Sequence, residues 1–275
     1  MFRLLWQELR FRRNGIIGWG IGVSLYATLY VGLYPSFGDQ LALFDMGEMA
    51  FYEALGITDM TSFAGYVAST YVNLAPILLS IYAILSGSGT LAGEEDEGKL
   101  ELMVTLPIPR WQIVTAKAVA TAVALLLILA IMGAAAVGIL LSIQDQIETS
   151  ATAVDMFLSA LYMWPLVLVV AMISLFMGAY LPNRRTAALV ATVIFVASYF
   201  GNSLANLYDS VEPLKPIILF TYYDTAPAVL TDGQAPADTA VLLAISLILF
   251  LLAVWAFQRR NITVGAWPWQ RARVS

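Results

Sequence analysis

The chain has 275 residues, of which 60% are hydrophobic and only 12% are charged, and its mean hydropathy is +0.79. This composition excludes an ordinary soluble domain and indicates an integral membrane protein. Cysteine and histidine are both absent, which excludes disulfides, thiol nucleophiles, histidine-ligated metal sites and histidine-based catalysis.

The N-terminal residues 1–13 form an amphipathic pattern. Phe2, Leu5, Trp6 and Leu9 recur at helical spacing, and arginines occupy the opposite face. Such a segment predicts an interfacial, or elbow, helix that lies on the inner leaflet with its arginines near anionic headgroups. The alternative is a charged flank that only orients the first membrane span.

Six stretches of the chain are apolar and long enough to cross the hydrocarbon core, which takes about 20 helical residues. They cover residues 15–34, 66–91, 111–143, 156–181, 186–205 and 239–257. Helix is the expected form, because lipid offers no hydrogen-bond partner to an exposed backbone. The sequence therefore predicts an all-α membrane protein whose single transmembrane domain covers residues 1–275.

The basic residues predict the orientation of these spans. If the amino terminus is cytoplasmic, every lysine and arginine except Lys215 lies on the inner side, and most of the acids lie in outer loops. Cytoplasmic segments carry such an excess of positive charge. We therefore expect a multi-pass protein of the cell (inner or plasma) membrane, with both termini in the cytoplasm.

Polar and aromatic residues within the spans mark a possible substrate path. Tyr26 and Tyr30 are four residues apart on the first span and share one face. Asn73 and Asn202 are polar groups near membrane depth, where such side chains seek the interior of a bundle. An aromatic belt and ordinary hydrogen bonding between helices are the alternatives. Pro76, in the second span, predicts a freed backbone carbonyl and a bend that could act as a hinge.

Between the second and third spans, residues 93–101 carry five acids and a lysine. Gly93, Gly98 and Lys99 match the beginning of a phosphate-binding loop, but that motif requires Ser or Thr where this chain has Leu100. It also requires a preceding strand, and here a membrane helix precedes it. This chain is therefore not expected to hydrolyse ATP.

The same acidic segment has the pattern of a short cytoplasmic helix. Acids in the first turn of a helix over Glu94–Thr105 would complement the helix dipole, and Pro107 would end it. Arg110 and Trp111 would then begin the third span with a cation and an amphipathic ring at the membrane interface. A solvated loop that only satisfies topology is the alternative.

At these residues the chain resembles the permease subunits of type-2 ABC transporters. Members of that family often carry two acids, a Gly, a Glu-Leu pair, Leu-Pro-x-x-Arg and a Lys after the second span. The matching residues here are Glu94, Glu95, Gly98, Glu101, Leu102, Leu106, Pro107, Arg110 and Lys117. Lys99 stands where the family commonly has Thr.

The resemblance implies that two permease halves, identical or different, pair in the bilayer and that cytoplasmic ABC ATPase subunits bind them. The segment after the second span would be the coupling helix on which the ATPase docks. Its docking residues would be Glu94, Glu95, Glu97, Gly98, Glu101, Leu106, Pro107 and Arg110. ATP and Mg²⁺ would bind to the ATPase. We expect no cofactor, metal ion, catalytic residue or nucleic acid on this chain.

Residues 208–236 contain four prolines and a short apolar stretch. They predict either a re-entrant or interfacial piece that closes the outer mouth, or a simple external loop.

No span holds a charged side chain in its middle, which argues against a proton-coupled carrier. The leading hypothesis is the membrane subunit of an ATP-driven exporter. Two alternatives are a scaffold or immunity subunit that binds an ATPase without transport, and a membrane enzyme that modifies lipid. The substrate is not predicted.

Overall fold

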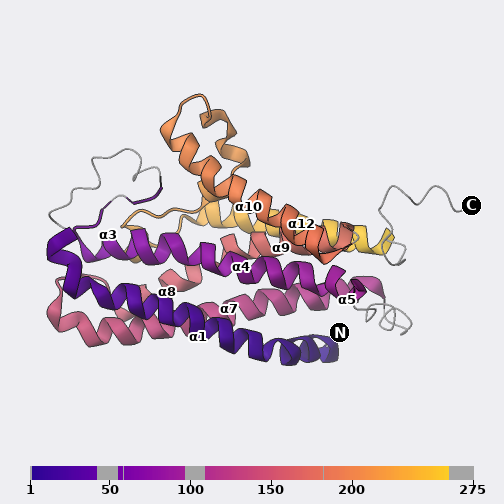
Figure 1. Cartoon of the computed structure of the whole chain (residues 1–275), viewed down its shortest axis with the longest axis horizontal. Helices are drawn as coiled ribbons and strands as arrows, with labels where there is room; N and C mark the ends of the chain where they lie inside the picture. The colour runs from indigo at the N-terminus through magenta and orange to yellow at the C-terminus, as the bar shows by residue number, and fades with distance from the viewer. Residues whose placement is uncertain (1, 42–54, 58, 97–108, 182, 260–275) are drawn as a thin grey trace, which may run out of the picture.

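Every regular element in the described part of the chain is helical, and six helical segments are long and apolar enough to cross a membrane (Figure 1). The structure is a computed structural model that describes residues 2–41, 55–57, 59–96, 109–181 and 183–259. The six segments are Arg3–Phe37, Phe63–Thr90, Arg110–Gln146, Ala153–Tyr180, Arg184–Leu207 and Pro236–Arg259. The prediction of an all-α membrane protein with six spans is confirmed, and most spans extend beyond the predicted ends.

The first span belongs to one long helix, α1 (Phe2–Leu41), of 40 residues. At about 1.5 Å per residue this helix is about 60 Å long, roughly twice the thickness of the hydrocarbon core. It packs along α7 (Arg110–Ile143), the long helix of the third span (Figure 1). The residues predicted as a separate interfacial helix are therefore the continuous beginning of α1.

The second span changes its helix type along its length. It begins with α3 (Phe63–Val67), continues as the π-helix η2 (Ala68–Val72) and ends as α4 (Asn73–Thr90). Ser62 caps α3 by accepting a hydrogen bond from the Gly65 N–H. A short helix, α5 (Ala92–Asp96), follows α4 and contains the first acids of the acidic segment.

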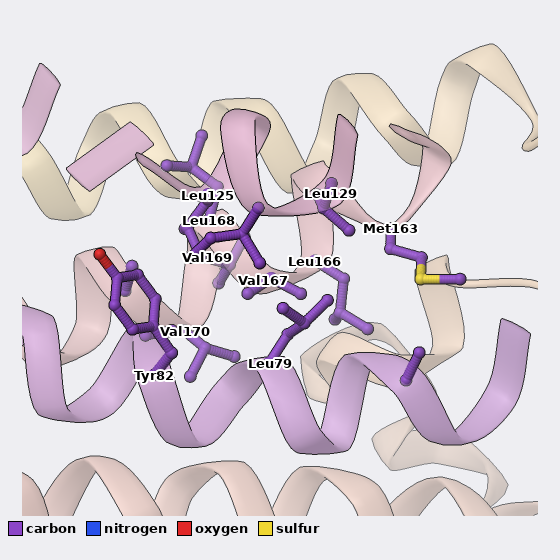
Figure 2. Packing of buried hydrophobic residues seen from close by; sticks show 14 of the residues in the cluster. Leu79, Tyr82, Leu125, Leu129, Met163, Leu166, Val167, Leu168, Val169 and Val170 are labelled. Carbon is purple, nitrogen blue, oxygen red and sulfur yellow. The ribbon is translucent and has the colours of Figure 1, made fainter. Parts of the chain in front are cut away.

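The core of the bundle forms around α9 (Trp164–Tyr180), which packs against α4, α7, α10 (Arg184–Leu207) and α12 (Pro236–Arg259). Figure 2 shows the contact between the three central helices, with Leu79 and Tyr82 from α4, Leu125 and Leu129 from α7, and Leu166 to Val170 from α9. Helix α8 (Ala153–Tyr162) precedes α9 and begins with a capping box between Thr152 and Asp155. Close van der Waals packing of these buried apolar side chains holds the spans in one body.

The closest approach of α4 to α9 occurs at Gly87. A Cβ atom at this position would lie 2.7 Å from the Ala171 carbonyl oxygen and 2.7 Å from the Ser174 Cβ. The Ser174 hydroxyl donates to the Ile84 carbonyl across the same contact, at 2.8 Å. Glycine thus permits the backbones to approach closely, as small residues do between membrane helices.

The segment between the last two spans folds into short helical turns: η4 (Glu212–Ile217), η5 (Leu219–Tyr222) and α11 (Val229–Asp232). The Ser198 hydroxyl of α10 accepts a hydrogen bond from the Leu219 N–H at 2.8 Å. Leu219 and Phe220 are buried, and the Phe220 ring packs edge-on against Phe195. This segment is therefore packed against the bundle, a finding against the simple external loop.

Two ends of the bundle can be distinguished in Figure 1. The start of α1, helix α5 and the end of α12 lie at one end, and α3 with the start of α4 lies at the other. We call these the inner end and the outer end, following the orientation predicted from the basic residues.

Candidate functional site

A buried lysine lies at the inner end. Lys117, in the second turn of α7, has a side chain that is only 1% exposed. Its Nζ donates to Glu8 Oε1 of α1 at 2.8 Å and to Glu94 Oε1 of α5 at 2.5 Å. A buried ammonium requires such carboxylate partners, because a lone charge in an apolar interior is strongly unfavourable. Lys117 therefore joins three elements that are distant in sequence.

Arg12 extends this network to the second span. Its Nη1 donates to the Thr121 hydroxyl of α7 at 3.0 Å and to the Ser86 hydroxyl of α4. Its Nε lies 3.7 Å from Glu8 Oε2. Together, Glu8, Arg12, Glu94 and Lys117 form what we call the inner charge network, which connects α1, α4, α5 and α7.

The Glu94 side chain lies in an unusual environment for a carboxylate. Burial raises the pKa of Glu94 above its ordinary value, and the nearby Lys117 ammonium opposes that rise. Its Oε2 is buried and has no hydrogen-bond partner among the described residues. The Glu94 side chain is therefore turned into the protein, where its charge depends on Lys117.

The predicted docking residues have different positions. Glu94 is paired inside the protein, the backbone of Glu95 lies in α5, and Arg110 begins α7. Five others lie outside the described residues: Glu97, Gly98, Glu101, Leu106 and Pro107. Lys117, noted in the sequence only as part of a family pattern, is the centre of the inner charge network, and its burial could not be read from a single sequence.

The predicted substrate-path tyrosines make contacts within the bundle. The Tyr26 hydroxyl donates to the Thr70 carbonyl at 2.7 Å, and its ring lies 4.6 Å from that of Tyr30. The Tyr30 carbonyl in turn accepts the Tyr66 hydroxyl at 3.0 Å. The Tyr26 hydroxyl thus satisfies a carbonyl of the π-helix η2, a role that its spacing in the sequence does not indicate.

A second tyrosine completes the backbone of the second span. Pro76 has no N–H, so the Val72 carbonyl four residues earlier lacks its usual α-helical partner. The Tyr223 hydroxyl, from the segment before α11, donates to that carbonyl at 2.8 Å. Burial raises the pKa of Tyr223 well above its ordinary value, so the hydroxyl keeps its proton. The carbonyl that Pro76 was predicted to free is that of Val72, and its hydrogen-bond donor, Tyr223, was not predicted from the sequence.

Asn73 and Asn202, the other two predicted path residues, line the same pocket at the outer end. This outer pocket has a volume of about 400 Å³ and lies between the start of α4, the last turns of α10 and the segment that carries Tyr223. The Asn73 side chain donates to the Leu55 carbonyl at 2.7 Å, and Asn202 Oδ1 accepts from the Thr221 hydroxyl at 3.2 Å. The pocket thus brings together two amides that are far apart in the sequence.

Comparison with known protein families decides the class of the protein. A family model described as "ABC-2 family transporter protein" matches residues 2–262, nearly the whole chain. The chain belongs to this family. None of the curated proteins matches it.

As an ABC-2 permease, the chain is a multi-pass membrane subunit of an ABC transporter. Subunits of this kind are not themselves the ATPase, and membership implies association with ABC ATPase subunits. The inner charge network then lies at the start of the acidic segment that we predicted to be the coupling helix.

Proposed function

We propose that this permease is the membrane subunit of an ATP-driven exporter in the cell membrane. A separate cytoplasmic ATPase, which binds ATP and Mg²⁺, docks on the acidic segment 94–110 at the inner end. A second permease half, identical or different, completes the transporter in the bilayer, and both termini of each half lie in the cytoplasm.

The inner charge network is the observation that carries this proposal. The acidic segment leaves the bundle through α5 and returns through α7, and Glu94 and Lys117 join these two helices directly. Lys117 also binds Glu8, so a displacement of the acidic segment by an ATPase would reach α1 as well as α7. Such a rigid link between a docking segment and the spans is what conversion of ATPase closure into helix movement requires.

The position of Glu94 refines the predicted docking surface. Because its carboxylate is paired with Lys117, Glu94 serves to fix the acidic segment to the bundle. The remaining acids of the predicted docking surface, Glu95, Glu97 and Glu101, are the ones we assign to contact with the ATPase. Arg110 would fix the far end of the segment at the membrane interface.

The test separates these two roles. The triple variant Glu95→Lys, Glu97→Lys and Glu101→Lys keeps the Glu94–Lys117 pair, so it should fold normally while failing to co-purify its cognate ATPase. Proteoliposomes with both subunits should lose ATP-dependent efflux. The matched control replaces three acids of the outer segment, Asp209, Glu212 and Asp232, by lysine. It should keep both ATPase binding and ATP-dependent efflux.

Two results would contradict the proposal. If the inner triple variant bound the ATPase and transported normally, the acidic segment would not be the docking surface. If the wild-type pair hydrolysed ATP together but moved no substrate in proteoliposomes, the non-transporting scaffold or immunity subunit would replace the exporter.

A further inference from the structure

The outer pocket presents opposite charges that are not paired with each other. Lys215 and Asp224 both line it, and among the described residues no ion pair joins them. Lys215 lies 3.7 Å from Glu212, a contact in which both side chains are substantially exposed and which is therefore weak. Among the described residues, the Asp224 carboxylate accepts a hydrogen bond only from the N–H of Ala226, two residues further along.

Neutral polar groups also line the pocket. They include Asn202 and Asn206 of α10 and the half-buried Tyr199, and within the described residues neither the Asn206 side chain nor the Tyr199 hydroxyl has a hydrogen-bond partner. Amide N–H and phenolic O–H groups are donors that suit a phosphate or carboxylate oxygen. Together with the Lys215 ammonium, they are the groups of the pocket that can bind an anion.

Other lining groups suit a cation. Tyr223 and Phe220 line the pocket together with Asp224, and the Phe220 ring lies edge-on at 5.2 Å from that of Tyr199. Aromatic faces and a carboxylate together attract a ligand ammonium group. The volume of about 400 Å³ lies within the range of small-molecule sites.

We infer that the outer pocket binds a zwitterionic group, with its anion at Lys215 and the α10 amides and its ammonium at Asp224 and the aromatic rings. Such a group could be the headgroup of an aminophospholipid or a soluble zwitterion of the same chemistry. The inference requires neither an ATPase nor export, so it can fail or hold independently of the proposed function.

The pocket also lies next to the end of the π-helical part of the second span. Asn73, which lines the pocket, follows η2 directly, and Tyr223, a second lining residue, donates to the Val72 carbonyl. A ligand in the pocket therefore lies beside this hydrogen bond. Its binding should stabilise the outer segment against unfolding.

Binding can be measured on the full chain alone, in nanodiscs of phosphatidylglycerol so that no zwitterionic lipid competes. The probes for titration calorimetry are phosphoethanolamine and dihexanoyl-phosphatidylethanolamine, with inorganic phosphate as the anion-only comparison. We expect saturable binding of at least one zwitterionic probe and at least tenfold weaker binding of phosphate. Equal binding of both zwitterions would identify a headgroup site, and binding of the lipid alone would identify a site that also uses the acyl chains.

Variants test the two charges separately. Lys215→Met and Asp224→Asn should each weaken binding about tenfold, as expected when a charge-assisted contact is lost. Asp209→Asn, an exposed acid of the same outer segment that does not line the pocket, is the matched control and should bind as the wild type does. Glu212→Gln frees Lys215 from its competing partner and should bind equally well or more tightly.

The inference is overturned if no zwitterionic probe binds saturably, or if Asp224→Asn leaves binding unchanged, because a site without a cation-binding side is a simple anion site. Thermal unfolding of each variant without ligand shows whether a loss of binding reflects a loss of fold. A variant that unfolds is replaced by Lys215→Gln or Asp224→Ser and titrated again.

Discussion

Removal of the Lys117 ammonium tests the inner charge network most severely. Lys117→Met keeps the length and apolar stem of the side chain but leaves Glu8 and Glu94 without their shared cation. Removing one partner of a buried ion pair costs about 3–5 kcal/mol. Because the Glu8 and Glu94 side chains are 17% and 23% exposed, water can reach them and the lower end applies. We expect a loss of about 3 kcal/mol in the free energy of unfolding.

The partner variant should behave differently. Burial already raises the pKa of Glu94 despite Lys117, so its charged form is held at a cost in the folded protein. Glu94→Gln removes that cost and leaves an amide oxygen that can still accept from Lys117. We expect Glu94→Gln to lower the free energy of unfolding by about 1 kcal/mol or less. The double variant should lose clearly less than the sum of the single losses, because it removes one of the unpaired acids.

The assay is reversible unfolding of the purified full chain in mixed micelles, with increasing sodium dodecyl sulfate followed by circular dichroism. Lys215→Met is the matched control, since the ion pair that Lys215 forms among the described residues is exposed and should contribute less than about 1 kcal/mol. The reasoning is refuted if Lys117→Met loses less than about 1 kcal/mol. It is also refuted if the effects of Lys117→Met and Glu94→Gln are simply additive.

Three further predictions concern stability. Tyr223→Phe should lower the free energy of unfolding by about 1–3 kcal/mol in the same assay, because the Val72 carbonyl loses its hydrogen-bond donor. Tyr71→Phe should leave the free energy of unfolding unchanged, since the buried Tyr71 hydroxyl has no partner among the described residues. Gly87→Ala should lose about 1–3 kcal/mol through overpacking against α9, and Gly22→Ala, whose Cβ would meet nothing within 4 Å, should not. Hydrogen bonds from Thr61 and Ser62 outweigh burial and lower the pKa of Asp59. Asp59 should therefore stabilise the fold above about pH 4 and lose that effect as pH falls through its folded-state pKa, so thermal unfolding of Asp59→Asn should differ from wild type at pH 7, and the difference should shrink as pH falls below about 4.

The six spans could be predicted because the length of an apolar run is dictated by the thickness of the bilayer. Their ends could not, since polar residues beyond the hydrocarbon core continue a helix when they find partners. Glu8 and Arg12 illustrate this: they read as part of a surface helix, but they bind Lys117 and Thr121 of α7, and α1 continues through them.

The outer pocket shows a second limit of prediction from the sequence. A proline in a span predicts a free carbonyl, and the structure has one at Val72. Which side chain satisfies it depends on the fold of a segment about 150 residues away in the sequence, so Tyr223 could not be identified in advance. Tyr26, chosen for its face on the first span, likewise proves to donate to a carbonyl of η2.

The central claim, that an ATPase docks on the acidic segment, is tested most directly by cross-linking in membranes. The chain contains no cysteine of its own, so only the introduced cysteine reacts on this subunit. A single cysteine at Glu101 should cross-link to the cognate ATPase through a short bis-maleimide when that subunit carries cysteines on its membrane-facing surface. A cysteine at Asp209, in the predicted outer segment, should form no such product. A cross-link from Asp209 and none from Glu101 would contradict both the orientation and the docking of the ATPase on the acidic segment.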